Sequence, residues 1–376
     1  MRALIYFDNA ATTWPKPADV VTAVAKCMES FGANPGRSGH SMSLKAAEKV
    51  YECRETAADF FGLANPGNVI FTPNATYGLN LVIRGIIRRG DHVICTCMDH
   101  NSVLRTLYSS GVVVSEAEAD SEGYVSEENI RRLILPDTRL IVMTHISNVC
   151  GTVLPVDRVA KLAHENGIPF LLDASQSAGI IDIDVSKTGI DYLVCPGHKS
   201  LYGPMGTGIV CINTDLHPEP LTFGGTGSYS QLLAQPGELP DRYESGTLNL
   251  PGICGMCEGI KYVRSIGTQH ILNHELALTA FFLGELSDIP HYRVVGKNST
   301  SGRTGVVSIV HQTKSSQEVA QLLNSDYNIA VRSMYHCAPH AHQALGTADG
   351  GTVRISSGVF TTLSEVKTLL YALEHI

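Results

Sequence analysis

Short apolar runs of strand length alternate with helix-period segments over the first two thirds of the chain. Amphipathic helical patterns lie between most of the runs, for example at 75–89 and 156–167, and the second pattern ends in a glycine suited to a helix C-terminus. This alternation predicts an α/β fold in which a mostly parallel sheet is covered by helices. The apolar runs occupy residues 68–71, 92–96, 112–117, 139–145, 169–173, 191–195 and 208–212.

The pattern changes after about residue 250. Long helical segments at 253–266 and 271–286 are followed by two strand-like runs, 305–310 and 352–356, and by a terminal helix at 364–376. A chain of 376 residues also exceeds the usual size of a single hydrophobic core. We therefore predict two domains: a large domain at 16–250, and a smaller α+β domain built from 1–15 and 251–376.

The composition is that of a globular protein, with 44% hydrophobic and 17% charged residues. A formal charge of −8 leaves no basic surface for nucleic acid or anionic lipid. The first 17 residues lack the apolar core of a signal peptide, and no later run is long enough to span a membrane, so a cytoplasmic location is expected. In that compartment the ten cysteines should be reduced thiols, most of them packed in the core.

Polar side chains follow several of the predicted strands, where ligands gather in an open α/β sheet. Taken one at a time, each has an ordinary explanation as a turn residue, a helix cap or a hydrogen-bonded scaffold residue. Together, a lysine for a Schiff base, a carboxylate for a pyridine nitrogen, an imidazole for ring stacking and a helix start for phosphate match pyridoxal phosphate. The strand-end residues are Asp99, His100, Asn148, Asp173, Gln176, His198 and Lys199, with the loop 73–76 before a helix.

In these segments the sequence resembles the cysteine desulfurase family of class V aminotransferases. This homodimeric, pyridoxal-phosphate-dependent group has the type I transferase fold and includes selenocysteine lyases. The resemblance spans nearly the whole chain, and the order and spacing of its segments are more specific than any single motif. The matching segments are YFDNAATT at 6–13, FTPNATYGLNLV at 71–82, DHNSVL at 99–104, ISNVCGTVLP at 146–155, LLDASQSAG at 171–179, GHKSLYGPMGTG at 197–208, YESGTLN at 243–249, VRSMYHCAP at 331–339 and VRISSGVFTT at 353–362.

The resemblance implies a role for each matching residue in holding the cofactor. Lys199 should form the Schiff base and move the substrate α-proton, Asp173 should pair with the pyridinium nitrogen, and His100 should stack on the ring. The remaining contacts are expected from Gln176 and Asn148 to the ring oxygen or the substrate, from Thr76 and His198 to the phosphate, and from Thr247 of a dimer mate. Pro196 departs from many relatives, because it removes a hydroxyl and a backbone N–H from the expected phosphate site.

The resemblance also implies the substrate contacts. Arg354 should bind the substrate α-carboxylate, because a guanidinium forms a bidentate pair with it. Arg332 and His40 are weaker candidates for the mouth of the site, and Cys337 is the expected nucleophile, since it lies in a polar stretch with histidine and arginine neighbours.

Two groups of residues admit other interpretations. The segment HCAPHAH, which contains Cys337, could instead be a metal site, although no second ligand cluster matches it and we predict no metal. Cys254 and Cys257 form a lone C-x-x-C in a helical pattern, for which core packing is favoured. No dinucleotide fingerprint or P-loop is present.

The predicted activity is conversion of L-cysteine to L-alanine, with the sulfur transferred to Cys337 as a persulfide and a sulfur-acceptor protein as a candidate partner. Selenocysteine lyase is one alternative. Another class V enzyme, an aminotransferase or a carbon–sulfur lyase, is a second. A non-catalytic sulfur carrier or metal-binding module on the same fold is the third.

Overall fold

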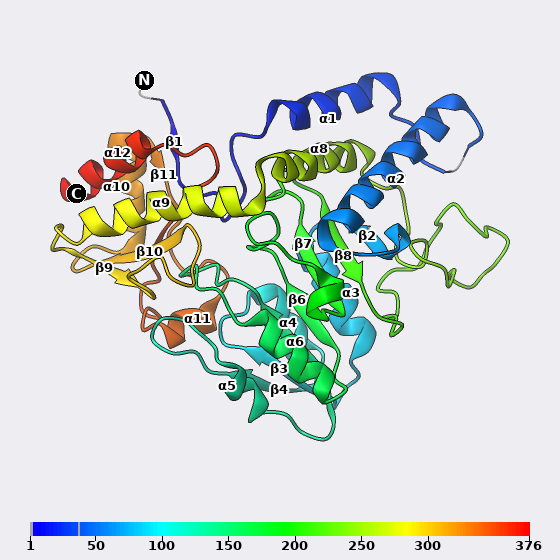
Figure 1. Ribbon diagram of the computed structural model, residues 1–376, viewed down its shortest axis with the longest axis horizontal. Helices are drawn as coiled ribbons and strands as arrows, with labels where there is room; N and C mark the ends of the chain where they lie inside the picture. Colours follow the sequence, from blue (N-terminus) through cyan, green and yellow to red (C-terminus); the bar gives the residue numbers. More distant parts are fainter. Residues whose placement is uncertain (1–2, 37) are drawn as a thin grey trace.

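A seven-stranded sheet forms the centre of the computed structural model, which describes residues 3–36 and 38–376 (Figure 1). The strand order is β2-β8-β7-β6-β5-β3-β4. Each strand was predicted from the apolar pattern, and its ends differ from the prediction by at most one residue. The bounds are β2 Val69–Thr72, β3 His92–Thr96, β4 Val113–Ala117, β5 Thr138–Thr144, β6 Phe170–Asp173, β7 Tyr192–Pro196 and β8 Gly208–Ile212.

The sheet is mostly parallel, as predicted. Strands β4, β3, β5, β6 and β7 run in one direction, and β8 is antiparallel to both of its neighbours, β7 and β2. The strand β2 therefore runs the same way as β7. The carboxyl ends of β2, β3, β5, β6 and β7 consequently meet at one edge of the sheet.

Helices cover both faces of this sheet (Figure 1). Successive strand residues point to opposite faces, so Ile94 of β3 belongs to one apolar cluster while its neighbours Val93 and Cys95 belong to the other. Helix α3 starts where predicted, because the Asn74 side chain accepts a hydrogen bond from the backbone N–H of Tyr77. The helices between the strands are α3 Ala75–Ile86, α4 Asn101–Ser109, α5 Glu127–Arg131, α6 Val156–Glu165 and α7 Val185–Thr188, with a 3-10 turn η1 at Pro66–Asn68.

Two further helices, α1 Ala18–Ser30 and α2 Ser41–Phe61, both pack against α8 Leu250–Ile266 (Figure 1). The predicted domain boundary separates α8 from α1 and α2, although both are in contact with it. The domain bounds themselves stay a prediction.

The rest of the chain forms a smaller α+β unit around a three-stranded antiparallel sheet of order β12-β10-β9. The N-terminal strand β1 pairs in parallel with β11, so the beginning of the chain joins its C-terminal third. The elements are β1 Ile5–Tyr6, α9 Thr268–Leu286, β9 Tyr292–Val295, β10 Val306–His311, α10 Ser316–Tyr327, β11 Ile329–Ala330, α11 Pro339–Ala344, β12 Val353–Ser356 and α12 Leu363–Glu374. Within the described ranges, none of the helices combines the length and the hydropathy that crossing a bilayer requires.

Glu275 of α9 is a buried carboxyl group whose protonation should affect stability. Burial raises its pKa from 4.5 to about 8, although a hydrogen bond from the backbone of Gly305 opposes the shift. Between these two values the folded protein keeps a proton that the unfolded chain has lost, so stability falls as the pH rises.

We expect Glu275→Gln to remove this dependence. Relative to the variant, the wild type should lose about 1.4 kcal/mol of unfolding free energy per pH unit between about pH 5 and pH 8. Urea unfolding of both proteins at several pH values measures the difference. Glu285→Gln, an exposed position on the same helix, is the control. Parallel pH profiles for wild type and Glu275→Gln would contradict the prediction.

Candidate active site

A cavity of about 210 Å³ lies at the carboxyl edge of the large sheet. It is reached by side chains from both parts of the molecule, because β12 and the segment after β11 face the strand ends. Nine of the residues singled out in the sequence line it: Thr76, His100, Asn148, Asp173, Gln176, His198, Lys199, Arg332 and Arg354. The structure therefore brings together residues that are up to 278 positions apart (76 to 354).

Lys199 lies three residues beyond the end of β7 and lines this cavity. Withdrawal from solvent lowers its pKa to about 8, with Arg354 and Arg332 adding to the effect and Asp173 opposing it. A fraction of the amine is therefore uncharged near neutral pH. The uncharged form is the one that attacks a carbonyl group.

Asp173 ends β6 as a buried carboxylate, 2% exposed, and its Oδ1 accepts a hydrogen bond from the backbone N–H of Ser175 at 2.9 Å. A second buried carboxylate, Asp99, fixes the neighbouring strand ends. Its oxygens accept hydrogen bonds from the backbone N–H groups of Thr96 and Thr144, each at 2.7 Å. Because Thr144 is paired with Asp173 across β5 and β6, Asp99 supports the position of Asp173.

His100 caps helix α4, where its Nδ1 accepts a hydrogen bond from the backbone N–H of Ser102 at 3.0 Å. Burial lowers its pKa to about 4; the carboxylate of Asp173 opposes this, and the cations of Lys199, Arg332 and Arg354 add to it. The imidazole is therefore neutral at physiological pH, which suits a ring that stacks on another ring.

Ser102 is a residue of the cavity that sequence reasoning missed. Its Oγ lies 2.8 Å from the Oγ1 of Thr76 and 2.8 Å from the Nδ1 of His100, so it links the starts of α3 and α4. Its position in the sequence could have indicated this role, because Ser102 is a hydroxyl residue two positions after the strand-end His100, inside a segment already matched to the family.

The cavity wall fits an anionic, ring-containing ligand. Its residues Asn74, Ala75 and Thr76 form the cap and first turn of α3, where backbone N–H groups favour a phosphate. The Nδ1 atom of His198 and the Nε of Arg354 are buried polar atoms without a partner among the described residues. Unsatisfied polar atoms in a native protein call for a ligand or water.

Arg354 of β12 is 1% exposed and is held in place by two acceptors. Its guanidinium donates to the Oδ1 of Asp8 and to the backbone oxygen of Asn148, both at 3.0 Å. Arg354 is therefore a buried residue of the cavity wall and not a surface arginine. The Asn148 amide in turn donates to the backbone oxygen of His336 at 2.6 Å, which joins the cavity to the segment that carries Cys337.

Cys337 does not line the cavity but lies beside it in an exposed loop, whereas the other nine cysteines are buried or half-buried. Its Sγ is 3.7 Å from a guanidinium nitrogen of Arg332, and its backbone oxygen accepts a hydrogen bond from Asn101, the residue after His100, at 2.8 Å. Cys337 itself has a φ of +59°, a conformation that costs a non-glycine residue about 1–3 kcal/mol. The loop is thus held in one strained shape.

The three histidines near Cys337 face separate partners. His336 bonds with the Oγ1 of Thr352 at 2.9 Å, His340 with Glu116 at 2.7 Å, and His342 with the Oγ1 of Thr347 at 2.7 Å. Over the ranges 3–36 and 38–376, the only group of side chains placed to share a metal ion lies elsewhere, at Glu52, Cys257 and Glu258. The alternative of a metal site in HCAPHAH therefore finds no support in the geometry.

Thr247 and His40 do not line the cavity within a single chain. Thr247 lines a different cavity of about 460 Å³, next to the glycine-rich segment 222–225. His40 is exposed and caps α2, with its Nδ1 accepting a hydrogen bond from Ser43 at 3.2 Å. The expected contribution of Thr247 to the site of a dimer mate, and that of His40 to the mouth of the site, stay predictions.

The peptide group before Lys199 is held by the N-terminal segment. The backbone oxygen of His198 accepts hydrogen bonds from the Nζ of Lys16 at 2.8 Å, from the hydroxyl groups of Thr12 and Thr13, and from the backbone N–H of Thr13. Burial lowers the pKa of Lys16 to about 8. Lys16 is therefore a positioning residue that sequence reasoning did not identify.

Residues 5–369 match the family model for class V aminotransferases. The chain belongs to the class V aminotransferase family. The resemblance seen in the sequence motifs and the expected fold are thereby confirmed.

Relatives of this member of the class V aminotransferase family match it over nearly its full length. A probable cysteine desulfurase of Methanothermobacter thermautotrophicus is 34% identical, over 100% of this chain and 95% of the relative. A probable cysteine desulfurase of Pyrococcus abyssi is 35% identical, over 99% and 94%. The solved structure of a cysteine desulfurase from Thermococcus onnurineus NA1 superposes with a TM-score of 0.93 at 33% identity, covering 99% of this chain and 94% of that one.

Proposed function

We propose that the protein is a pyridoxal-phosphate-dependent cysteine desulfurase, which converts L-cysteine to L-alanine and transfers the sulfur to Cys337 as a persulfide. The observation that carries the proposal is the exposed Cys337 in a strained, hydrogen-bonded loop beside a cavity that contains Lys199 and Asp173. An aminotransferase needs no such thiol. The named relatives support the same activity.

Pyridoxal phosphate, when bound, supplies an electron sink that stabilises negative charge on the substrate α-carbon. Lys199 would hold it covalently and then take the α-proton on its amine. The carboxylate of Asp173 would keep the ring nitrogen protonated, and the neutral His100 would stack on the ring. Gln176 would contact the ring oxygen. The phosphate would be held by the start of α3 through Thr76, with the Nδ1 of His198 as a further donor.

The substrate carboxylate would bind to Arg354, whose orientation is set by Asp8 and Asn148. Arg332, and His40 more distantly, would line the mouth of the site. The Arg332 guanidinium also lies 3.7 Å from the Cys337 sulfur. Cys337, reacting as a thiolate, would attack the substrate sulfur; the carbon–sulfur bond breaks, its electron pair passes to the carbon side, and alanine forms after proton uptake.

A homodimer in the cytoplasm is part of the proposal. The segment around residues 222–238 projects from the body of the molecule (Figure 1, light green) and exposes Phe223, Leu232 and Leu233. Apolar side chains on a projecting segment suit burial against a second copy, which would also receive Thr247. The exposed Cys337 would leave its persulfide accessible to a sulfur-acceptor protein.

The test is a side-by-side assay of L-cysteine and L-selenocysteine with the purified holoenzyme. We expect alanine from L-cysteine and, on the Cys337 peptide, a mass increase of one sulfur atom. Free sulfide without that modification would indicate a carbon–sulfur lyase, and dependence on an amino acceptor would indicate an aminotransferase. Alanine from selenocysteine alone would identify a selenocysteine lyase.

Lys16→Met should slow this reaction through a shift of Lys199. Losing a charge-assisted hydrogen bond to the His198 carbonyl costs about 1.5–3 kcal/mol, so we expect kcat to fall roughly 10- to 150-fold while KM for cysteine changes little. Lys16→Arg should restore most of the rate, because it keeps a charged donor. Steady-state kinetics give both parameters, with Lys161→Met at an exposed position as the control. A change confined to KM would contradict the positioning role.

A further inference from the structure

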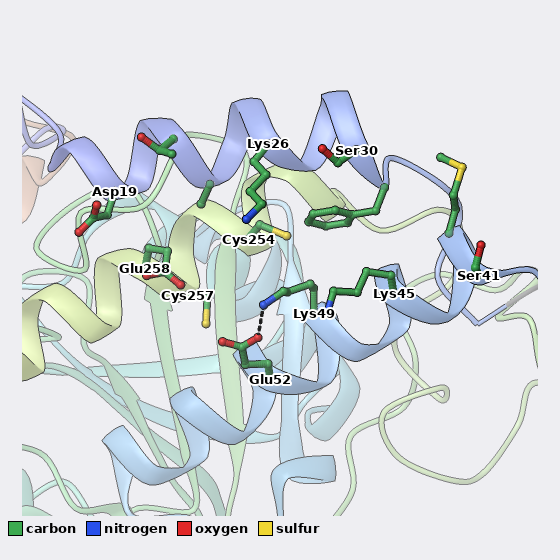
Figure 2. Close-up of a pocket in the computed structure, with 14 residues that line it drawn as sticks. Asp19, Lys26, Ser30, Ser41, Lys45, Lys49, Glu52, Cys254, Cys257 and Glu258 are labelled. Carbon is green, nitrogen blue, oxygen red and sulfur yellow. Dashed lines mark hydrogen bonds and ion pairs between the residues drawn. The ribbon is translucent and has the colours of Figure 1, made fainter.

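A larger cavity of about 630 Å³ lies between helices α1, α2 and α8 and shares no lining residue with the candidate active site (Figure 2). Cys254 and Cys257 line it from α8. Charged side chains of both signs surround them: Asp19, Glu52 and Glu258, and Lys26, Lys45 and Lys49. The cavity therefore suits a ligand that carries both carboxylate and ammonium groups.

Each of the two lining thiols has a second thiol as its neighbour. Cys53 of α2 interacts with Cys257, and Cys27 of α1 interacts with Cys254. Cys53 and Cys27 are both 0% exposed, and neither lines the cavity. Each pair thus combines an outer thiol, at the cavity wall, with an inner thiol behind it. This is the arrangement of an attacking and a resolving cysteine.

The two outer thiols differ in their surroundings. The pKa of Cys257 is lowered by its interactions with Cys53 and Thr56 and by the nearby charge of Lys261, in opposition to burial. The pKa of Cys254 is instead raised to about 12, chiefly by burial. Cys257 also contacts the Oγ1 of Thr56 at 3.7 Å, so the two pairs in this cavity differ in their polar neighbours and can serve as test and control.

The carboxylates near Cys257 are already paired with lysines, which argues against a metal ion at this place. Ligand atoms of Glu52, Cys257 and Glu258 lie within 4.8 Å of one another. However, Lys49 contacts Glu52 at 2.6 Å, and Lys261 contacts Glu52 at 2.5 Å and Glu258 at 2.8 Å. A metal ion would have to displace two ammonium groups. The network instead places paired ammonium and carboxylate groups beside the Cys257 sulfur.

We propose that Cys257 and Cys53 form a redox-active dithiol that reacts with a small zwitterionic disulfide, of the amino-acid or peptide class, bound in this cavity. The Cys257 thiolate attacks one sulfur of the ligand, so that a mixed disulfide forms and one small thiolate leaves and takes up a proton. Cys53 then gives up its proton and attacks the Cys257 sulfur. A Cys53–Cys257 disulfide forms, and the second small thiol leaves with that proton. Two electrons pass from the protein to the ligand.

Peptide mapping of the holoenzyme tests this, with Cys337→Ser as background to remove the exposed thiol and with oxidised glutathione as the probe. We expect a disulfide-linked pair of peptides containing Cys53 and Cys257. Cys53→Ser should stop the reaction at a glutathione adduct on Cys257, whereas Cys257→Ser should leave both sites unmodified. The matched variants Cys27→Ser and Cys254→Ser should form the Cys53–Cys257 link at the parent rate.

Three results would overturn the proposal. The first is no link in the folded parent protein although both thiols react after unfolding. The second is an adduct on Cys254 as abundant as that on Cys257. The third is equal rates for oxidised glutathione and for cystamine, a cationic disulfide, after each rate is divided by the rate of the same disulfide with free cysteine. The proposal expects cystamine to react at least about fivefold more slowly.

Discussion

Replacing Lys199 by alanine is expected to lower alanine formation from L-cysteine by roughly 10⁴-fold or more, because one side chain both holds the cofactor and moves a proton. Its place in the cavity, its lowered pKa and the adjacent Asp173 all support these roles. Borohydride treatment followed by mass spectrometry should attach pyridoxal phosphate to the Lys199 peptide of the wild type. The variant should carry none.

Lys187→Ala is the control for this experiment, since Lys187 is an exposed lysine at the end of α7. It should keep wild-type activity and leave the attachment at Lys199 unchanged. Covalent cofactor at another lysine, or appreciable alanine formation by Lys199→Ala, would show that a different amine does the chemistry.

Replacing Cys337 by serine is expected to reduce sulfur release from L-cysteine by about 10²–10³-fold while the cofactor stays attached to Lys199. The reason is spatial: Cys337 lies outside the cavity that would hold the cofactor, with its sulfur beside Arg332. The persulfide on its peptide should disappear. This split between lost transfer and retained cofactor separates a sulfur nucleophile from a residue that only supports the fold.

Cys97→Ser provides the comparison, because Cys97 is half-buried and does not line the candidate active site. It should retain both activity and the persulfide at Cys337. Unchanged sulfur transfer in Cys337→Ser would contradict the role of Cys337 as the sulfur nucleophile, on which the proposed function rests. Alanine formation with release of free sulfide would then be the simpler explanation.

Local sequence signals were enough to predict the strands, the start of α3 and the polar residues at the strand ends. Alternation and apolar runs are read over a few residues, and the backbone hydrogen bonds of helices and turns are equally local. Parallel strands share one carboxyl edge, so Asp173, Lys199 and His100 could be assigned to one site without coordinates.

Contacts between distant segments depended on the tertiary structure. The hydrogen bond of Lys16 to His198 and the ion pair of Asp8 with Arg354 join positions 182 and 346 residues apart. The C-x-x-C pair in α8 looked like core packing, and its cysteines are indeed buried. Only the packing of α1 and α2 on α8 places Cys27 and Cys53 behind them.

The sequence by itself therefore determined the sheet, the family and the identity of the residues expected to react, because these follow from short-range pattern and motif order. The tertiary structure alone decided the contacts that hold those residues in place. Ser102 links two helix starts, Asp99 accepts a hydrogen bond from the strand residue paired with Asp173, and Cys337 lies in a strained loop. Such contacts are set by how helices and sheets pack. No periodicity along the chain records that packing.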